Sequence, residues 1–153
     1  MAENLTFEIK IPTDSDGFVL LQCPLCGEFF KLTPSDIKAD DVLEIWCPNC
    51  GLKSDNYLTD DVKELALRKA KNYVNQLLAD TLKKMERNTR NKLISFKVKR
   101  QTPQVFEYPI VPITDDLEVV NYSCCKRSAK ISPSLKLSGS YCPFCGVRYD
   151  EQA

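Results

Sequence analysis

Eight cysteines constrain the fold of this 153-residue chain more than any other feature, because they form four close pairs and the chain has no histidine. The pairs are Cys23 with Cys26, Cys47 with Cys50, Cys124 with Cys125, and Cys142 with Cys145. The absence of histidine excludes imidazole acid–base chemistry, Ser-His and Cys-His nucleophile pairs, and mixed cysteine–histidine fingers. The cysteine pairs therefore become the main candidates for a functional site.

The start of the chain has neither the basic region nor the apolar stretch of a secretory signal, and no apolar run is long enough to span a membrane. We therefore expect a cytoplasmic protein with no membrane partner. In such a reducing compartment, close cysteine pairs bind metal more often than they form disulfides.

Three of the pairs lie in the same local motif, Cys-Pro-x-Cys-Gly, at residues 23–27, 47–51 and 142–146. Such a turn brings two thiolates to one metal, because proline presets φ after the first cysteine and glycine tolerates positive φ after the second. Twenty residues separate Cys26 from Cys47, which suits two turns joined by a hairpin. Cys23, Cys26, Cys47 and Cys50 are therefore predicted to hold one structural Zn²⁺ ion.

The fourth pair departs from this motif, since Cys124 and Cys125 are adjacent and have no proline or glycine beside them. Sixteen residues separate Cys125 from Cys142, so we predict a second Zn²⁺ site at Cys124, Cys125, Cys142 and Cys145. One alternative is a site of three sulfurs completed by water or an aspartate. Another is a crossed site, in which Cys23 and Cys26 share a metal with Cys142 and Cys145.

Residues 18–51 resemble the zinc-ribbon superfamily, in which two such turns on paired hairpins hold one metal. Residues 120–149 are similar to it as well, apart from the adjacent cysteines of their first turn. The resemblance implies a ribbon fold, Cys23, Cys26, Cys47 and Cys50 as zinc ligands, and a binding role rather than catalysis.

Catalytic roles for the cysteines are less favoured. A Cys-Pro-x-Cys turn also resembles the active turn of glutaredoxins, but here it recurs with the spacing of metal ligands. A catalytic zinc needs an open coordination position, whereas four thiolates close the shell. We therefore expect a protein that is not an enzyme.

Periodicity predicts short strands and one long helix. Strands are expected at residues 5–11, 18–21, 28–32, 42–46, 93–100 and 117–122. A helix is expected from Thr59 or Asp60 to about Arg90, with a basic face on one side and an apolar arc on the other. The arc is expected to pack on both ribbons or on a second copy of the chain. The arc comprises Val62, Ala66, Ala70, Tyr73, Val74, Leu77, Leu78 and Met85. The predicted fold class is α+β, with two small β zinc ribbons joined by this amphipathic helix, and the predicted domains are residues 1–57, 58–91 and 92–153.

Charge is unevenly distributed along the chain. Residues 1–65 have a net charge of minus eight and residues 66–100 a net charge of plus nine, although the whole chain sums to zero. The favoured hypothesis is an adaptor that binds another protein, or a second copy of itself, through the helix. The alternative is a transcription-factor-like protein that binds DNA or RNA through its basic segment. The residues expected to contact phosphates are Lys83, Arg87, Arg90, Lys97, Lys99 and Arg100.

Overall fold

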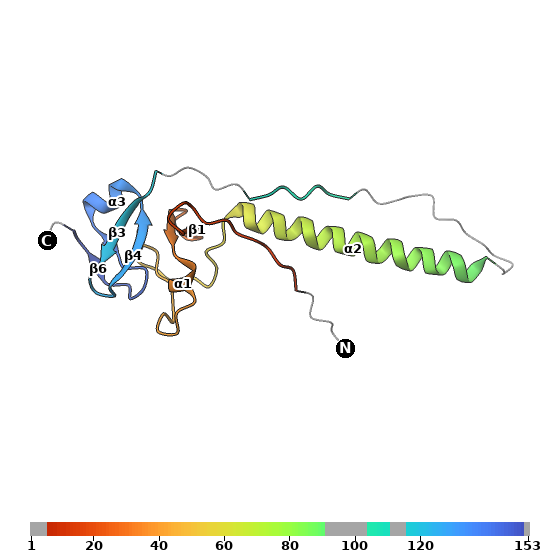
Figure 1. The fold of residues 1–153 in the computed structure, drawn as a ribbon, viewed down its shortest axis with the longest axis horizontal. Coiled ribbons are helices and arrows are strands. Elements are labelled where there is room, and N and C mark those ends of the chain that lie inside the picture. Colours follow the sequence, from red (N-terminus) through yellow and green to blue (C-terminus); the bar gives the residue numbers. More distant parts are fainter. Residues whose placement is uncertain (1–5, 91–103, 111–115, 152–153) are drawn as a thin grey trace. The chain divides into compact units, whose positions relative to one another are not determined.

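The computed structural model describes residues 6–90, 104–110 and 116–151 (Figure 1). The chain divides into two compact units. One consists of Met1–Lys10 with Asp61–Pro109, and the other of Ile11–Asp60 with Ile110–Ala153. The second unit contains all eight cysteines.

A four-stranded antiparallel sheet forms the centre of the cysteine-containing unit, with strand order β1-β2-β4-β3. Its strands are β1 (Val19–Gln22), β2 (Phe29–Leu32), β3 (Glu118–Tyr122) and β4 (Arg127–Ile131). Two hairpins, β1–β2 and β3–β4, make this sheet, and they come from opposite ends of the sequence. One sheet therefore carries the first ligand pair of each cysteine cluster.

A short helix and a short hairpin follow each long hairpin. Helix α1 (Pro34–Ile37) begins after Thr33, whose side chain accepts a hydrogen bond from the Asp36 N–H, and helix α3 (Pro133–Ser138) occupies the corresponding place after β4. Strands β5 (Ser140–Tyr141) and β6 (Arg148–Tyr149) pair with each other. In the first half, a single bridge between Trp46 and Lys53 takes the place of such a strand pair.

The two halves of this unit are structural repeats. In the long hairpins, Val19 pairs with Leu32 while Glu118, 99 positions later than Val19, pairs with Ile131, 99 positions later than Leu32. Strands β2 and β4 meet at Lys31 and Lys130, which are also 99 positions apart. Because equivalent residues face each other across an antiparallel pair, the two hairpins are related by an approximate twofold axis at this contact.

The hydrophobic core lies within this repeat. Phe30, Leu32, Tyr122, Ala129 and Ile131 are fully buried, together with cysteines from both clusters. The ring of Tyr57 contacts Phe30 edge-on, with ring centroids 5.5 Å apart. The predicted α+β architecture, with two cysteine-bearing hairpin systems separated in sequence by a long helix, is confirmed.

The other unit is built on helix α2 (Asp60–Thr89), whose limits agree with the prediction. Its polar face holds extended parts of the same chain. The side-chain amide of Asn72 donates to the Val105 carbonyl at 2.7 Å and accepts from the Val105 N–H at 2.8 Å. Arg68 donates to the Phe106 carbonyl at 3.1 Å, and Lys69 to the Glu8 carbonyl at 3.2 Å.

The second half of the apolar helix arc is not buried within the described residues of the single chain, so its packing on a second copy stays a prediction. Val62 and Leu65 are the buried residues among those described in α2, whereas Val74, Leu77, Leu78 and Met85 are about half exposed. The reason is that the polar side chains Arg68 and Asn72, rather than the leucines, hold the chain's own extended segment.

Two predicted strands also differ from the structure, and a third is not described. Residues 6–11 form no strand: Phe7 contacts Tyr73 of α2 with ring centroids 5.9 Å apart, whereas Ile11 packs against the core of the cysteine-containing unit. Residues 42–46 form only the bridge at Trp46. The predicted strand at 93–100 lies outside the described residues.

Candidate metal centres

The first cluster forms where two hairpin tips meet. Cys23 and Cys26 lie in the turn that joins β1 to β2, and Cys47 and Cys50 lie in the turn closed by the Trp46–Lys53 bridge. The Sγ atoms of Cys23 and Cys50 are 3.8 Å apart, and those of Cys26 and Cys47 are 3.5 Å apart. All four Sγ atoms lie within 4.8 Å of one another.

These separations fit one tetrahedral metal ion. Four sulfurs at about 2.3 Å from a central ion are about 3.8 Å from one another. The cluster therefore needs little movement to hold a metal between the two turns.

The second cluster forms in the same way between the β3–β4 turn and the β5–β6 turn. The Sγ atoms of Cys145 and Cys124 are 3.6 Å apart, and the four sulfurs of Cys124, Cys125, Cys142 and Cys145 lie within 4.8 Å of one another. The adjacent cysteines both reach the cluster because their turn closes at Lys126 with a φ of 55°, where the first turn has Gly27 with a φ of 79°.

This arrangement decides between the groupings that the sequence left open. Cys23 and Cys26 lie with Cys47 and Cys50, so the crossed grouping with Cys142 and Cys145 is wrong. The second cluster offers four sulfurs, so it needs no water or aspartate to complete its ligand set.

Each Cys-Pro-x-Cys-Gly turn has the same pair of backbone hydrogen bonds. The first cysteine donates its N–H to the carbonyl five residues later, and the glycine N–H donates back to the carbonyl of that cysteine, at 2.8–2.9 Å in all three turns. Because the same backbone bonds recur in each turn, the three motifs offer their thiols in a similar geometry.

Burial and hydrogen bonds act in opposite directions on the thiols. Burial raises the pKa of Cys47 and of Cys142, the inner thiols of the two clusters. Burial opposes ionisation of Cys26 too, but the Glu28 N–H and the Cys47 thiol outweigh it and lower the pKa of Cys26. The Val147 N–H and neighbouring thiols similarly lower the pKa of Cys145 against its burial.

The two short hairpins pack on each other through an aromatic ring and a glycine on each side. The backbone N–H of Trp46 donates to the Pro143 carbonyl, and the backbone N–H of Tyr141 donates to the Pro48 carbonyl, each at 2.8 Å. A Cβ atom on Gly146 would lie 2.7 Å from the Trp46 ring, and one on Gly51 would lie 3.0 Å from the Tyr141 ring. Both glycines have positive φ, so close approach and backbone conformation both favour glycine here.

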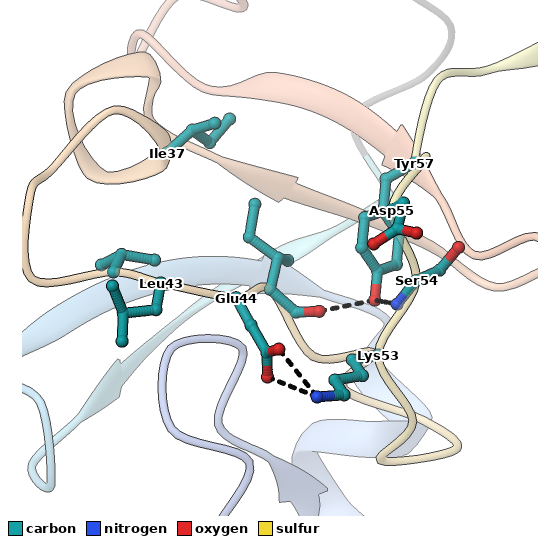
Figure 2. A pocket seen from close by; sticks show the side chains of 9 residues that line it. Ile37, Leu43, Glu44, Lys53, Ser54, Asp55 and Tyr57 are labelled. Atoms are coloured by element: carbon teal, nitrogen blue, oxygen red, sulfur yellow. Dashed lines mark hydrogen bonds and ion pairs between the residues drawn. The ribbon is translucent and has the colours of Figure 1, made fainter.

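A hollow of about 680 Å³ lies beside the turn of the first cluster (Figure 2). The Tyr57 hydroxyl donates to the Ile45 carbonyl at 2.6 Å and accepts from the Ser54 N–H at 2.8 Å. Lys53 donates to both carboxylate oxygens of Glu44, at 2.7 and 2.9 Å. These contacts join the two sides of the turn that carries Cys47 and Cys50, so the wall of the hollow supports the first cluster.

The residues predicted to bind nucleic acid are only partly described. Lys83, Arg87 and Arg90 are exposed on or just after α2. Lys97, Lys99 and Arg100 lie outside the described residues.

Sequence reasoning missed the residues that join the two repeats. Neither the cysteine motifs nor the hydrophobic periodicity identifies Asp14, Trp46 or Tyr141 as such residues. The available signal was the similarity of Lys31-Leu32-Thr33-Pro34-Ser35 to Lys130-Ile131-Ser132-Pro133-Ser134, 99 positions later.

No protein-family model, curated protein or solved structure matches the chain. Within the described part of the chain, no helix is both long and apolar enough to cross a membrane.

Proposed function

We propose that the chain is a non-enzymatic adaptor whose cysteine clusters each hold one structural Zn²⁺ ion. Tetrahedral sets of four sulfurs suit zinc or iron. Zinc has no redox chemistry, which suits a structural role. Four thiolates leave no open position for a reacting water, which supports a structural rather than a catalytic ion. The recurrence of the same turn on paired hairpins supports a relationship to zinc ribbons, and eight reduced cysteines suit a cytoplasmic location.

One observation carries the adaptor role: α2 presents a stripe of exposed apolar side chains. Leu67, Val74, Leu78 and Met85 are 71, 52, 54 and 49% exposed. At about 100° per residue their positions fall within about 40° of one another round the helix. A contiguous exposed apolar surface of this kind is typical of interaction sites.

The stripe is separate from the helix face that the chain uses for itself. Asn72, which holds Val105, lies about 160° round the helix from Val74. The apolar stripe is thus available to another protein or to a second copy of the chain, while the opposite face holds the segment that contains Val105.

The test compares two variants of α2. Val74→Asp combined with Leu78→Asp places charge in the stripe, and Gln76→Asp places it on an exposed position of the other face. We expect the wild type to exceed 17.4 kDa in solution, or to retain a partner in affinity capture, and the stripe variant to lose that association. Gln76→Asp should keep it. A monomeric wild type that captures nothing, or equal association by all three proteins, would contradict the adaptor role.

A second candidate function is nucleic-acid binding, which the exposed Lys83, Arg87 and Arg90 favour. Contacts with phosphates predict retention on a DNA column that falls steeply as salt rises. Lys83→Glu combined with Arg87→Glu should weaken retention. Absence of retention by the wild type at low salt would remove this candidate.

A further inference from the structure

The two cysteine clusters differ in how far their sulfurs are shielded from solvent. In the first cluster, Cys23 and Cys47 are buried, with 1 and 0% exposure, and Cys26 is exposed. In the second cluster, Cys124 and Cys145 are both exposed and Cys142 is the buried member. The second cluster therefore presents an open edge of two sulfurs.

The repeat explains where this edge comes from. By the 99-position equivalence, Tyr122 takes the place of Cys23, and Cys124 takes the place of Leu25. Tyr122 is fully buried, whereas Leu25 is 60% exposed at the tip of its turn. One ligand has thus moved from an inner position of the hairpin to its outer tip.

The pairing of neighbouring sulfurs differs as well. Each close pair in the first cluster includes a buried sulfur, since Cys23 lies 3.8 Å from Cys50 and Cys47 lies 3.5 Å from Cys26. In the second cluster, the two exposed sulfurs Cys124 and Cys145 are themselves 3.6 Å apart. An oxidant can therefore reach one member of that pair while the other is already adjacent.

We propose that the Cys124–Cys145 edge is a modification site for peroxides. One thiolate attacks the peroxide, breaks its O–O bond and becomes a sulfenic acid, and the leaving oxygen departs as hydroxide or alkoxide. The second thiolate attacks the sulfenic sulfur, forms the disulfide and releases hydroxide. Two electrons pass from the two sulfurs to the peroxide, so no other reductant or oxidant is needed.

Disulfide formation removes two ligands from the second centre. Cys125 and Cys142 remain, and two thiolates do not complete the four-ligand set that structural zinc requires. The second centre would thus release its ion under peroxide sooner than the first. The inference depends on both centres being loaded with zinc, as proposed above.

The experiment uses the zinc-loaded wild-type protein, with two ions per chain verified by elemental analysis. Hydrogen peroxide is added in small steps, released zinc is followed with a colorimetric chelator, and disulfides are mapped by mass spectrometry. The same chelator without peroxide serves as the control for spontaneous release. We expect the ion of the second cluster to leave on the order of tenfold faster than the ion of the first cluster, because oxidation follows thiolate exposure. A Cys124–Cys145 disulfide should form at the same rate as this release.

Release of both ions at one rate would overturn the inference, as would a first disulfide among Cys23, Cys26, Cys47 and Cys50. These outcomes would leave the zinc centres themselves intact. Purified protein without bound zinc would instead overturn the proposed centres, and this inference with them.

Discussion

Lys31 and Lys130 lie opposite each other on β2 and β4, and both donate to the same carboxylate oxygen of Asp14, at 3.1 and 2.7 Å. All three side chains are almost fully buried. The other oxygen of Asp14 accepts from the Phe18 N–H at 2.9 Å, which fixes the carboxylate in its turn. Where the two repeats meet, one carboxylate therefore offsets the repulsion between two equivalent lysines.

Asp14→Asn should destabilise the cysteine-containing unit. Burial opposes ionisation, but hydrogen bonds from Lys130, the Phe18 N–H and Lys31 hold the pKa of Asp14 far below its ordinary value, so the ionised carboxylate stabilises the fold. Removing one partner of a buried ion pair costs about 3–5 kcal/mol. We expect the lower end in denaturant unfolding of the zinc-loaded protein, because Lys130 keeps a second contact with Asp16 at 2.7 Å.

Asp16→Asn provides the matched control for this variant. The Asp16 side chain is 62% exposed and contacts Lys130 but not Lys31. Its loss should cost less than about 1 kcal/mol, as for other exposed ion pairs. Equal destabilisation by the two variants would argue against Asp14 as the residue that joins the repeats.

Gly146→Ala should disrupt the packing of the two short hairpins. Gly146 and Gly27 have similar positive φ values of 75° and 79°, but an added Cβ meets the Trp46 ring at Gly146 and open space at Gly27. Both alanine variants should lose about 1–2 kcal/mol from the backbone conformation. Gly146→Ala should lose about 1–3 kcal/mol more from overpacking, measured as the difference in unfolding free energy. Equal losses would show that the ring contact contributes nothing.

Tyr122 should ionise late in the folded protein. Burial is the main cause that raises its pKa from 10.0 to about 12. Because the neutral phenol is favoured in the folded state, this contribution to stability is complete below pH 10 and is lost as the pH rises to about 12. The difference in phenolate absorbance between the wild type and Tyr122→Phe should have its midpoint near pH 12. A midpoint near pH 10 would show that the phenol is open to water.

Asn72→Ala should release the segment that contains Val105 from α2. The variant loses both hydrogen bonds between the Asn72 amide and the Val105 backbone. With about 1 kcal/mol per bond, exchange of the Val105 N–H with deuterium should accelerate by roughly tenfold or more. Gln76→Ala, at an exposed position one turn further along α2, should leave the exchange rate unchanged. Similar exchange rates in all three proteins would contradict the role of Asn72 in holding this segment on α2.

Local motifs explain why the sequence predicts the clusters well. A Cys-Pro-x-Cys-Gly turn specifies its own backbone through proline, glycine and two backbone hydrogen bonds, so the grouping of Cys23, Cys26, Cys47 and Cys50 follows from short-range information. The extent of α2 also follows from short-range information, since residues 60–89 contain neither glycine nor proline.

Non-local pairing explains most of what the sequence did not predict. The contact between Lys31 and Lys130 joins residues 99 positions apart, and hydrophobic periodicity contains no information about such a partner. The face of α2 that contacts the chain's own extended segment is not predictable for a similar reason. Periodicity identifies an apolar stripe, but the amide of Asn72 decides which face receives the chain's own extended segment.

Native mass spectrometry of protein purified without added metal counts the ions that each chain holds. We expect a 17.4 kDa chain carrying two zinc ions, with all eight cysteines protected from alkylation until the metal is chelated. A metal-free chain with freely reactive thiols, or with disulfides between the cysteines, would contradict this expectation.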